Sequence, residues 1–215
     1  MTGKESRSRG LYRLEGLTRE VTARGESLDE ERQRFERLKG AEAPRVVVAD
    51  QLFQTPPEIA GPMAAAAYSY QRNARRVLEP SAGLGRLIAP ALSYFAHAEI
   101  FAVDIAPGCI QHLETADFDR VSTMQADFLT LTPEGIGSFD VVLMNPPFRR
   151  GLDIAHIRHA LQFVRPGGVL VGLCYAGQKQ ARELLPQADQ WSQLPAKSFR
   201  KSGTDAPVFQ VIFAK

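Results

Sequence analysis

The stretch that decides the fold is Val77-Leu78-Glu79-Pro80-Ser81-Ala82-Gly83-Leu84-Gly85-Arg86-Leu87. Its apolar start indicates a short buried strand, its two glycines a tight turn, and its end the first residues of a helix. Gly83 and Gly85 can adopt positive φ angles and let a ligand approach the backbone closely. The spacing is ExxxGxG and not the GxGxxG of dinucleotide sites. We therefore expect a smaller ligand that carries an amino acid and a nucleoside.

Two acids follow expected strands downstream of this turn. Asp104 ends the run Ile100-Phe101-Ala102-Val103, about 20 residues beyond the glycines, where doubly wound folds place the acid that binds ribose hydroxyls. Asp127, followed by Phe128, lies where the adenine edge of such a ligand would sit. For Asp127 alone, a helix cap or a solvated loop acid is the preferred interpretation.

The tetrapeptide Asn145-Pro146-Pro147-Phe148 directly follows the apolar run at 139–144. A conjugated amino nitrogen is a poor nucleophile because its lone pair is delocalised, and two hydrogen-bond acceptors can draw that lone pair out. The side-chain oxygen of Asn145 and the backbone carbonyl of Pro146 can act as these acceptors. Phe148 can stack on the planar group. The tetrapeptide predicts methyl transfer to a planar amine, and a proline-rich turn that closes a strand is the ordinary alternative.

In this order and spacing, the motifs resemble those of class I S-adenosylmethionine-dependent amino-methyltransferases over about residues 50–215. More narrowly, the chain is similar to adenine-specific N6 DNA methyltransferases with the NPPF motif, of the small orphan phage or plasmid type. The resemblance implies S-adenosyl-L-methionine as the cofactor. The catalytic residues that it implies are Asn145, Pro146, Pro147 and Phe148, and the cofactor-binding residues are Thr55, Glu79, Pro80, Ser81, Gly83, Gly85, Asp104, Ile105, Asp127 and Phe128.

The resemblance also implies a nucleic-acid substrate, with DNA favoured over RNA. Phe199 lies in the segment 194–204, which is similar to the family's late base-contacting motif. Lys201 beside it is expected to meet phosphates, as are Arg149 and Arg150 after the catalytic motif. For any one of these basic residues, a solvated loop is the ordinary alternative.

Several alternatives stay open at this point. The DNA enzymes of this type carry a large target-recognition domain, whereas this chain stops at Lys215 directly after its last expected strand. We therefore expect relaxed specificity, a recognition subunit or a homodimer. The alternative substrates are adenine or guanine in RNA and a protein glutamine. A subunit that binds S-adenosylmethionine without turnover is the alternative from another class.

Apolar runs alternate with helical patterns from residue 46 onward, which is typical of a parallel sheet covered on both faces. We expect an α/β, doubly wound, mostly parallel Rossmann-like methyltransferase sheet, and the resemblance implies an antiparallel C-terminal strand. The expected helices cover 59–76 and 154–164, and a turn is expected at 165–168. The expected strands cover 76–80, 99–104, 121–125, 139–144, 169–174 and 207–213.

Two domains are expected, a charged N-terminal extension at 1–45 and the methyltransferase domain at 46–215. The extension is polar and basic at its start, and a capping-box pattern at Ser27 predicts a charged helix after it. It is therefore expected to be partly disordered or helical.

Composition restricts the function less than the motifs do. The 26 basic and 24 acidic residues leave a net charge of +2, which is too small to establish nucleic-acid binding. Cys109 and Cys174 are interpreted as reduced, and His156 and His159 as surface histidines without a metal site. No apolar stretch approaches about 18 residues, so we expect a cytoplasmic protein that does not bind membranes.

Overall fold

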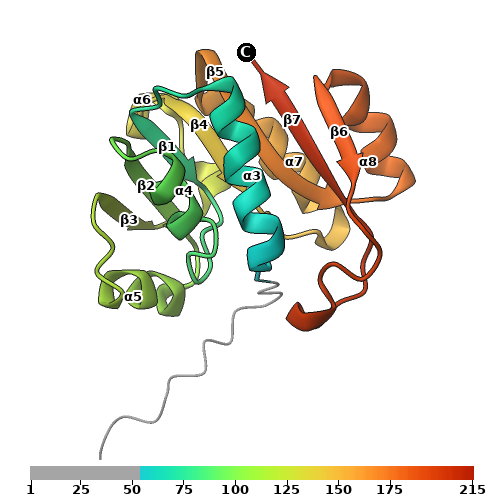
Figure 1. The fold of residues 1–215 in the computed structure, drawn as a ribbon, viewed down its shortest axis with the longest axis horizontal. Helices are drawn as coiled ribbons and strands as arrows, with labels where there is room; N and C mark the ends of the chain where they lie inside the picture. Colours follow the sequence, from blue (N-terminus) through green and yellow to red (C-terminus); the bar gives the residue numbers. More distant parts are fainter. Residues whose placement is uncertain (1–53) are drawn as a thin grey trace, which may run out of the picture. The chain divides into compact units, whose positions relative to one another are not determined.

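The computed structural model describes residues 54–215, in which seven strands form one sheet in the order β3-β2-β1-β4-β5-β7-β6. Strands β1 to β5 run parallel, whereas β7 is antiparallel to both of its neighbours (Figure 1). The expected α/β, doubly wound sheet with an antiparallel C-terminal strand is confirmed, and this strand belongs to a hairpin. The strand order reverses between β1 and β4, which is where such sheets bind ligands.

The strands are β1 (Arg76–Glu79), β2 (Glu99–Asp104), β3 (Val121–Gln125), β4 (Phe139–Met144), β5 (Val164–Tyr175), β6 (Gln190–Gln193) and β7 (Val208–Ala214). The α-helices are α3 (Pro57–Tyr70), α4 (Ile88–Tyr94), α5 (Pro107–Thr115), α6 (Pro133–Ile136), α7 (Leu152–Ala160) and α8 (Gln178–Glu183).

Strands β1 to β4 lie where the sequence predicts them, and the differences among the expected elements fall at their ends. Strand β6 is not among the expected elements. The helix expected over 59–76 ends at Tyr70, because the following residues turn and Arg76 already pairs with Glu99 of β2. The turn expected at 165–168 is instead part of β5, which starts at Val164 and pairs there with Phe139. Backbone pairing with neighbouring strands therefore sets these ends.

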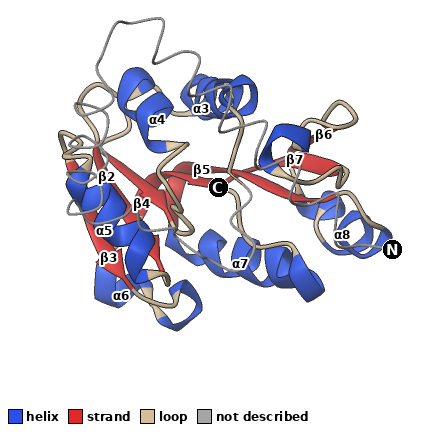
Figure 2. Ribbon diagram, turned by 90° about the horizontal axis from the view of Figure 1, so that it is seen from below, coloured by secondary structure: helices blue, strands red, loops and turns tan. Residues whose placement is uncertain are grey.

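Helices cover both faces of the sheet (Figure 2). Helices α3 and α4 and Leu113 of α5 pack into one buried apolar cluster, and α7 packs into a second cluster together with Leu184 after α8. Each strand of the central sheet supplies both clusters, since successive side chains of a strand point to opposite faces. Leu78 and Val142 face the second cluster, whereas Val77 and Val141 face the first.

Asp140 is a buried carboxylate, only 2% exposed, that binds groups at the starts of three strands. One carboxylate oxygen accepts hydrogen bonds from the backbone nitrogens of Arg75 and Arg76, at 2.6 and 2.8 Å, and the other forms an ion pair with Arg165. A Cβ on Gly168 would lie 2.8 Å from the carbonyl oxygen of Asp140, so only glycine fits there. These contacts hold β1, β4 and β5 in register at the edge opposite the cavity.

The expected N-terminal extension at 1–45 lies outside the described residues. Within residues 54–215, no helix is long and apolar enough to cross a membrane.

Candidate active site

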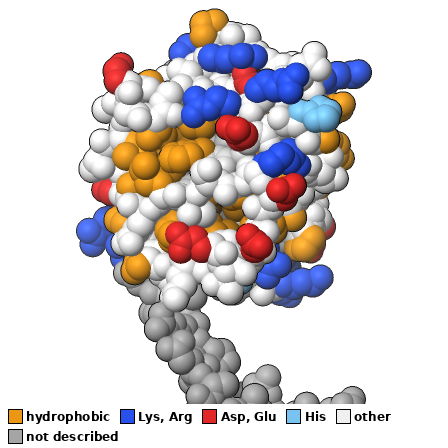
Figure 3. Space-filling view, turned by 90° about the vertical axis from the view of Figure 1, so that its left-hand side faces the viewer, with side chains coloured by type: hydrophobic (Ala, Val, Ile, Leu, Met, Phe, Trp, Pro, Cys, Tyr) orange, Lys and Arg blue, Asp and Glu red, His pale blue; other side chains and the backbone are white. Residues whose placement is uncertain are grey.

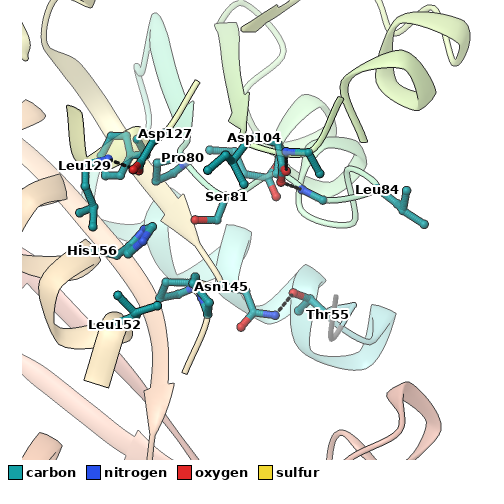
Figure 4. A pocket seen from close by; sticks show the side chains of 18 of the residues that line it. Thr55, Pro80, Ser81, Leu84, Asp104, Asp127, Leu129, Asn145, Leu152 and His156 are labelled. Carbon is teal, nitrogen blue, oxygen red and sulfur yellow. Dashed lines mark hydrogen bonds between the residues drawn. The ribbon is translucent and has the colours of Figure 1, made fainter. Parts of the chain in front are cut away.

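A cavity of about 580 Å³ opens where β1, β2, β3 and β4 end (Figure 4). All four expected catalytic residues and every expected cofactor residue except Gly85 lie on its wall. The lining residues are Gln54, Thr55, Glu79, Pro80, Ser81, Ala82, Gly83, Leu84, Arg86, Asp104, Ile105, Ala106, Pro107, Ala126, Asp127, Phe128, Leu129, Asn145, Pro146, Pro147, Phe148, Arg149, Leu152 and His156.

Asp104 at the end of β2 shapes the glycine turn that follows β1. Its Oδ2 accepts a hydrogen bond from the backbone nitrogen of Gly83 at 2.8 Å, and its Oδ1 accepts one from Ala106 at 2.8 Å. Gly83 has a φ of 53°, in the left-handed region that favours glycine. A carboxylate has about four lone-pair sites, so Asp104 can accept hydrogen bonds from ribose hydroxyls as well.

Gly85 serves helix packing, and the structure does not support its expected contact with a ligand. Its φ is 73°, which again favours glycine. A Cβ at this position would lie 2.7 Å from Cδ2 of Leu113 and 3.2 Å from Cδ1 of Ile88. Gly85 therefore allows the start of α4 to pack closely against α5, as the third glycine of a dinucleotide motif does for its own helix.

Three buried polar side-chain atoms in residues 54–215 have no hydrogen-bond partner, and all three belong to the cavity wall. They are Oε2 of Glu79, Oγ of Ser81 and Nδ1 of His156. Buried polar atoms without a partner cost about 1–3 kcal/mol each, and native proteins keep few of them. Their concentration on one cavity fits a polar ligand that supplies the missing partners, as the amino acid and nucleoside of S-adenosylmethionine would.

Glu79 is a buried carboxyl group on the cavity wall. Burial raises the pKa of its carboxyl group well above the ordinary value of 4.5, and the nearby charge of Asp104 raises it further. A cationic group in the cavity would reverse this effect because it favours the ionised carboxylate. The sulfonium and ammonium groups of S-adenosylmethionine are cations of this kind, so the residues present fit that cofactor.

The nucleobase end of the expected site is formed by Ile105 and Asp127. Ile105 is 65% exposed and lines the cavity, so it offers an apolar face to a planar ring. Asp127 accepts a hydrogen bond from the backbone nitrogen of Leu129 at 3.0 Å, which confirms the preferred interpretation as a cap. Phe128 is only 2% exposed and packs against Phe163. Phe128 therefore supports the wall more than it contacts a ligand.

The tetrapeptide that is expected to be catalytic, Asn145–Phe148, lies at the end of β4, on the other side of the cavity from Asp127 (Figure 4). The side-chain amide nitrogen of Asn145 donates a hydrogen bond to the hydroxyl oxygen of Thr55 at 3.1 Å. Pro146 is buried, whereas Phe148 is half-buried and contributes to the wall. Thr55, expected to contact the cofactor, therefore also orients the amide of Asn145, a role that no sequence pattern indicates.

The expectation that His156 and His159 are surface histidines is wrong. His156 is half-buried and lines the cavity beside Asp127 and Leu152 (Figure 4). Its pKa is lowered, chiefly because burial disfavours the charged imidazolium. His159 is also half-buried, and its Nε2 lies 3.0 Å from the carbonyl oxygen of Leu131. Helical spacing alone could not show this, because the face in question packs against the segment after β3.

Three of the four expected substrate-binding residues do not line the cavity. Phe199 is 1% exposed and belongs to the same apolar cluster as α3, so the structure does not place it for stacking on a base. Lys201 forms an ion pair with Glu58 at 3.8 Å. Arg150 is exposed and lies next to the cavity residue Arg149. The burial of Phe199 could not be predicted, because the basic residues around it are typical of an exposed loop.

Figure 3 shows one face of the molecule, on which basic side chains gather toward the top, most acidic side chains lie below them, and a group of apolar side chains lies to the left of the centre. No group of three or more histidine, cysteine, aspartate or glutamate side chains within residues 54–215 is arranged to hold a metal ion.

One curated relative is similar to this chain in sequence. It is the rRNA N(6)-adenosine-methyltransferase metl-5 of Caenorhabditis elegans, which is 31% identical over 135 residues. The match covers 57% of this chain and 61% of the relative, so it spans less than two thirds of that protein.

Two solved structures share the fold. PH1948 from Pyrococcus horikoshii, described as a candidate RNA methyltransferase, superposes with a TM-score of 0.61 at 18% identity, covering 79% of this chain and 91% of that one. The 16S rRNA N2 G1207 methyltransferase RsmC of Thermus thermophilus, solved with AdoMet and guanosine, gives a TM-score of 0.56 at 20% identity. That match covers 78% of this chain and 45% of RsmC. At these identities the similarity shows the fold alone.

The family follows from a further match, which covers most of the sheet and the cavity. Residues 66–195 match the model of the methyltransferase small domain. The chain therefore belongs to the methyltransferase small domain family and has the S-adenosylmethionine-binding methyltransferase fold.

Proposed function

We propose that the protein transfers a methyl group from S-adenosylmethionine to the exocyclic N6 amine of adenine in RNA. The observation that carries this proposal is the arrangement of the cavity. The segment Asn145–Phe148 forms one wall, and the Glu79–Gly83 turn with Asp104 forms another. A planar amine held by Asn145 would share one cavity with the cofactor.

The substrate is proposed from the curated relative. Metl-5 of Caenorhabditis elegans is named as an rRNA N6-adenosine methyltransferase, which supports the RNA alternative over the DNA substrate that the motif resemblance favours. Adenine carries the conjugated amine that the tetrapeptide suits, and unpaired RNA bases can be splayed out for recognition on aromatic side chains.

The residues of this chain chiefly align the amine. Bound S-adenosylmethionine supplies a methyl group that is already activated by its sulfonium. The side-chain oxygen of Asn145 and the backbone carbonyl of Pro146 accept hydrogen bonds from the amine and stabilise the positive charge that develops on nitrogen. The hydrogen bond to Thr55 fixes which way the Asn145 amide faces. Phe148 stacks on the base, and the released proton leaves to water.

Parallel methylation assays test this proposal. Purified protein would receive S-adenosylmethionine with a labelled methyl group and be offered rRNA, DNA and a protein extract in separate reactions. Digestion of the products and mass spectrometry would identify the modified residue. We expect label in RNA, as N6-methyladenosine. Label confined to DNA or to protein glutamine would contradict the RNA assignment, and a protein that binds the cofactor but methylates none of the three would favour a non-catalytic subunit.

A further inference from the structure

Tyr175 is an exposed aromatic residue at the cavity edge of the sheet, outside the cavity itself. It ends β5 and is 39% exposed. Met144 of β4 lies opposite Gly172 of β5, so Tyr175 extends to the level of the catalytic segment 145–148. Among the described residues, the other exposed tyrosine and tryptophan rings lie on helices α3 and α4 or on the edge strand β6. Tyr175 thus lies at the same edge of the sheet as the cavity.

A buried polar network fixes the backbone of Tyr175. Asp153 is fully buried, and its Oδ2 accepts a hydrogen bond from the backbone nitrogen of Tyr175 at 2.9 Å. The amide nitrogen of Gln180 lies 3.1 and 3.0 Å from the two oxygens of Asp153. The start of α7, the end of β5 and helix α8 are therefore held together. A satisfied buried network of this kind rigidifies the surface that it supports.

The same network joins the backbone of Tyr175 to the segments that carry two cations. Lys179 precedes Gln180 in α8, and its side chain extends to Gly151. A Cβ built on Gly151 would lie 3.0 Å from Nζ of Lys179. Arg150, next to Gly151, has a φ of 56°, a left-handed conformation that is uncommon for residues other than glycine. Strained backbone of this kind concentrates at ligand sites. Arg150 and Lys179 are both exposed.

Arg150 and Lys179 differ from the basic residues Arg200 and Lys201 in that no acidic side chain of the described residues neutralises them. Within residues 54–215, neither Arg150 nor Lys179 has an acidic partner, whereas Lys201 is paired with Glu58 and Arg200 with Asp205. An exposed ring and unneutralised cations on adjoining segments are features that bind single-stranded nucleic acid, through stacking on a base and attraction to phosphates.

We propose that Tyr175, Lys179 and Arg150 form a platform for the unpaired nucleotides that flank the target adenine. Tyr175 stacks on a neighbouring base, and the two cations contact the phosphates on either side of it. The platform holds the strand in register while the target base occupies the cavity. This inference rests on the proposed function, since it concerns the nucleic acid that the cavity would methylate.

Binding of a short fluorescein-labelled single-stranded RNA with one central adenine tests the platform. Fluorescence anisotropy would be measured with S-adenosylhomocysteine present, over a range of salt concentrations. Tyr175→Ala should weaken binding about tenfold, because stacking on an aromatic ring is worth about 1–3 kcal/mol per base. Tyr175→Phe keeps the ring and should bind like the wild type. Lys179→Ala should lower the salt slope by about 0.7, the value for one phosphate contact on a single strand.

Two matched controls use the same assay. Trp191→Ala removes an exposed ring from the edge strand β6, where it is 52% exposed. Arg158→Ala removes a cation of α7 that is already paired with Glu183 at 3.1 Å. Both variants should bind the RNA like the wild type and keep its salt slope.

The proposal is overturned if Tyr175→Ala and Lys179→Ala bind the RNA like the wild type, or if they lose no more affinity than the controls. An equal loss on a blunt RNA duplex would overturn the stacking assignment. These results are independent of turnover: a protein that binds through the platform but methylates nothing contradicts the proposed function, whereas one that methylates RNA without needing Tyr175 contradicts the platform alone.

Discussion

The side-chain amide of Asn145 donates a hydrogen bond to the hydroxyl of Thr55 at 3.1 Å, although the two residues are 90 positions apart in the chain. The contact joins the segment before α3 to the end of β4. Figure 4 shows the amide oxygen of Asn145 turned away from Thr55. An acceptor in a fixed direction is what the proposed amine-holding step needs, because preorganised groups pay no reorganisation cost during the reaction.

Thr55→Val should lower methyl transfer about threefold to tenfold, because it removes a hydrogen bond worth about 0.5–1.5 kcal/mol while keeping the shape of the side chain. Initial rates at saturating cofactor would measure the effect. Thr55→Ser keeps the hydroxyl and should retain most of the activity. A valine variant that matches the wild type would show that Asn145 does not depend on Thr55 for its orientation.

Asp104→Ala should weaken binding of S-adenosylhomocysteine by about 1.5–3 kcal/mol, the value of a hydrogen bond to a charged group. The change also removes the acceptors of the backbone nitrogens of Gly83 and Ala106. Calorimetric titration of the folded variant gives the affinity directly. If a correctly folded Asp104→Ala protein bound the ligand as tightly as the wild type, the assignment of the ribose end of the cavity would be lost.

Gly85→Ala should lower the free energy of unfolding by about 1–3 kcal/mol, since it adds a side chain to a strained and crowded position. The added Cβ would lie 2.7 Å from Leu113. Gly61→Ala is the matched control, because nothing lies within 4 Å of that position in helix α3, and alanine there should stabilise by about 0.5–1 kcal/mol. Urea denaturation measures both, and equal effects at the two positions would refute the packing role of Gly85.

Glu79→Gln should stabilise the cofactor-free protein, increasingly so as the pH rises. The folded-state pKa of Glu79 lies well above 4.5, so the folded protein holds a proton that the unfolded chain releases. The wild type therefore loses stability as the pH rises from the unfolded pKa through the folded pKa, whereas glutamine does not titrate.

Unfolding free energies measured between pH 5 and 8 would show this growing advantage, and S-adenosylhomocysteine should bind the Glu79→Gln protein more weakly. A stability difference that does not change with pH would contradict the assigned pKa direction.

Much of the sheet and of the cavity could be predicted from the sequence, because short-range patterns mark strand ends. The stretch 77–87 begins with an apolar run, Asp104 and the segment 145–148 each follow one, and Asp127 follows a strand of mixed polarity. Parallel strands bring their carboxyl ends to one edge of the sheet. Strand β6 could not be predicted, since all four of its residues are exposed and no apolar alternation remains. The antiparallel position of β7 came from family resemblance and not from its own pattern.

Contacts between distant segments account for what the sequence does not show. Phe199 lies among lysine and arginine residues, yet its loop folds back so that the ring is buried in the apolar cluster of α3. The hydroxyl of Ser202 in this loop donates a hydrogen bond to the carbonyl oxygen of Gln54 at 2.6 Å, across 148 positions. His156 lines the cavity because of another contact between distant segments, in which the ring of His156 on α7 packs against the ring of Phe128.

Asn145 provides the most direct test of the central claim. Wild-type protein, Asn145→Ala and Asn145→Asp would be incubated with RNA and S-adenosylmethionine, and N6-methyladenosine would be quantified by mass spectrometry of the digested RNA. Alanine should lower the rate about a hundredfold or more, because a preorganised contact to developing charge is lost. Aspartate keeps an acceptor and should retain more activity than alanine.

S-adenosylhomocysteine should bind all three proteins with similar affinity, since Asn145 is proposed to act on the amine. Formation of N6-methyladenosine by the wild type, together with its near loss in Asn145→Ala at unchanged cofactor affinity, is the result that the account predicts. Formation of N6-methyladenosine by Asn145→Ala at the wild-type rate would contradict it.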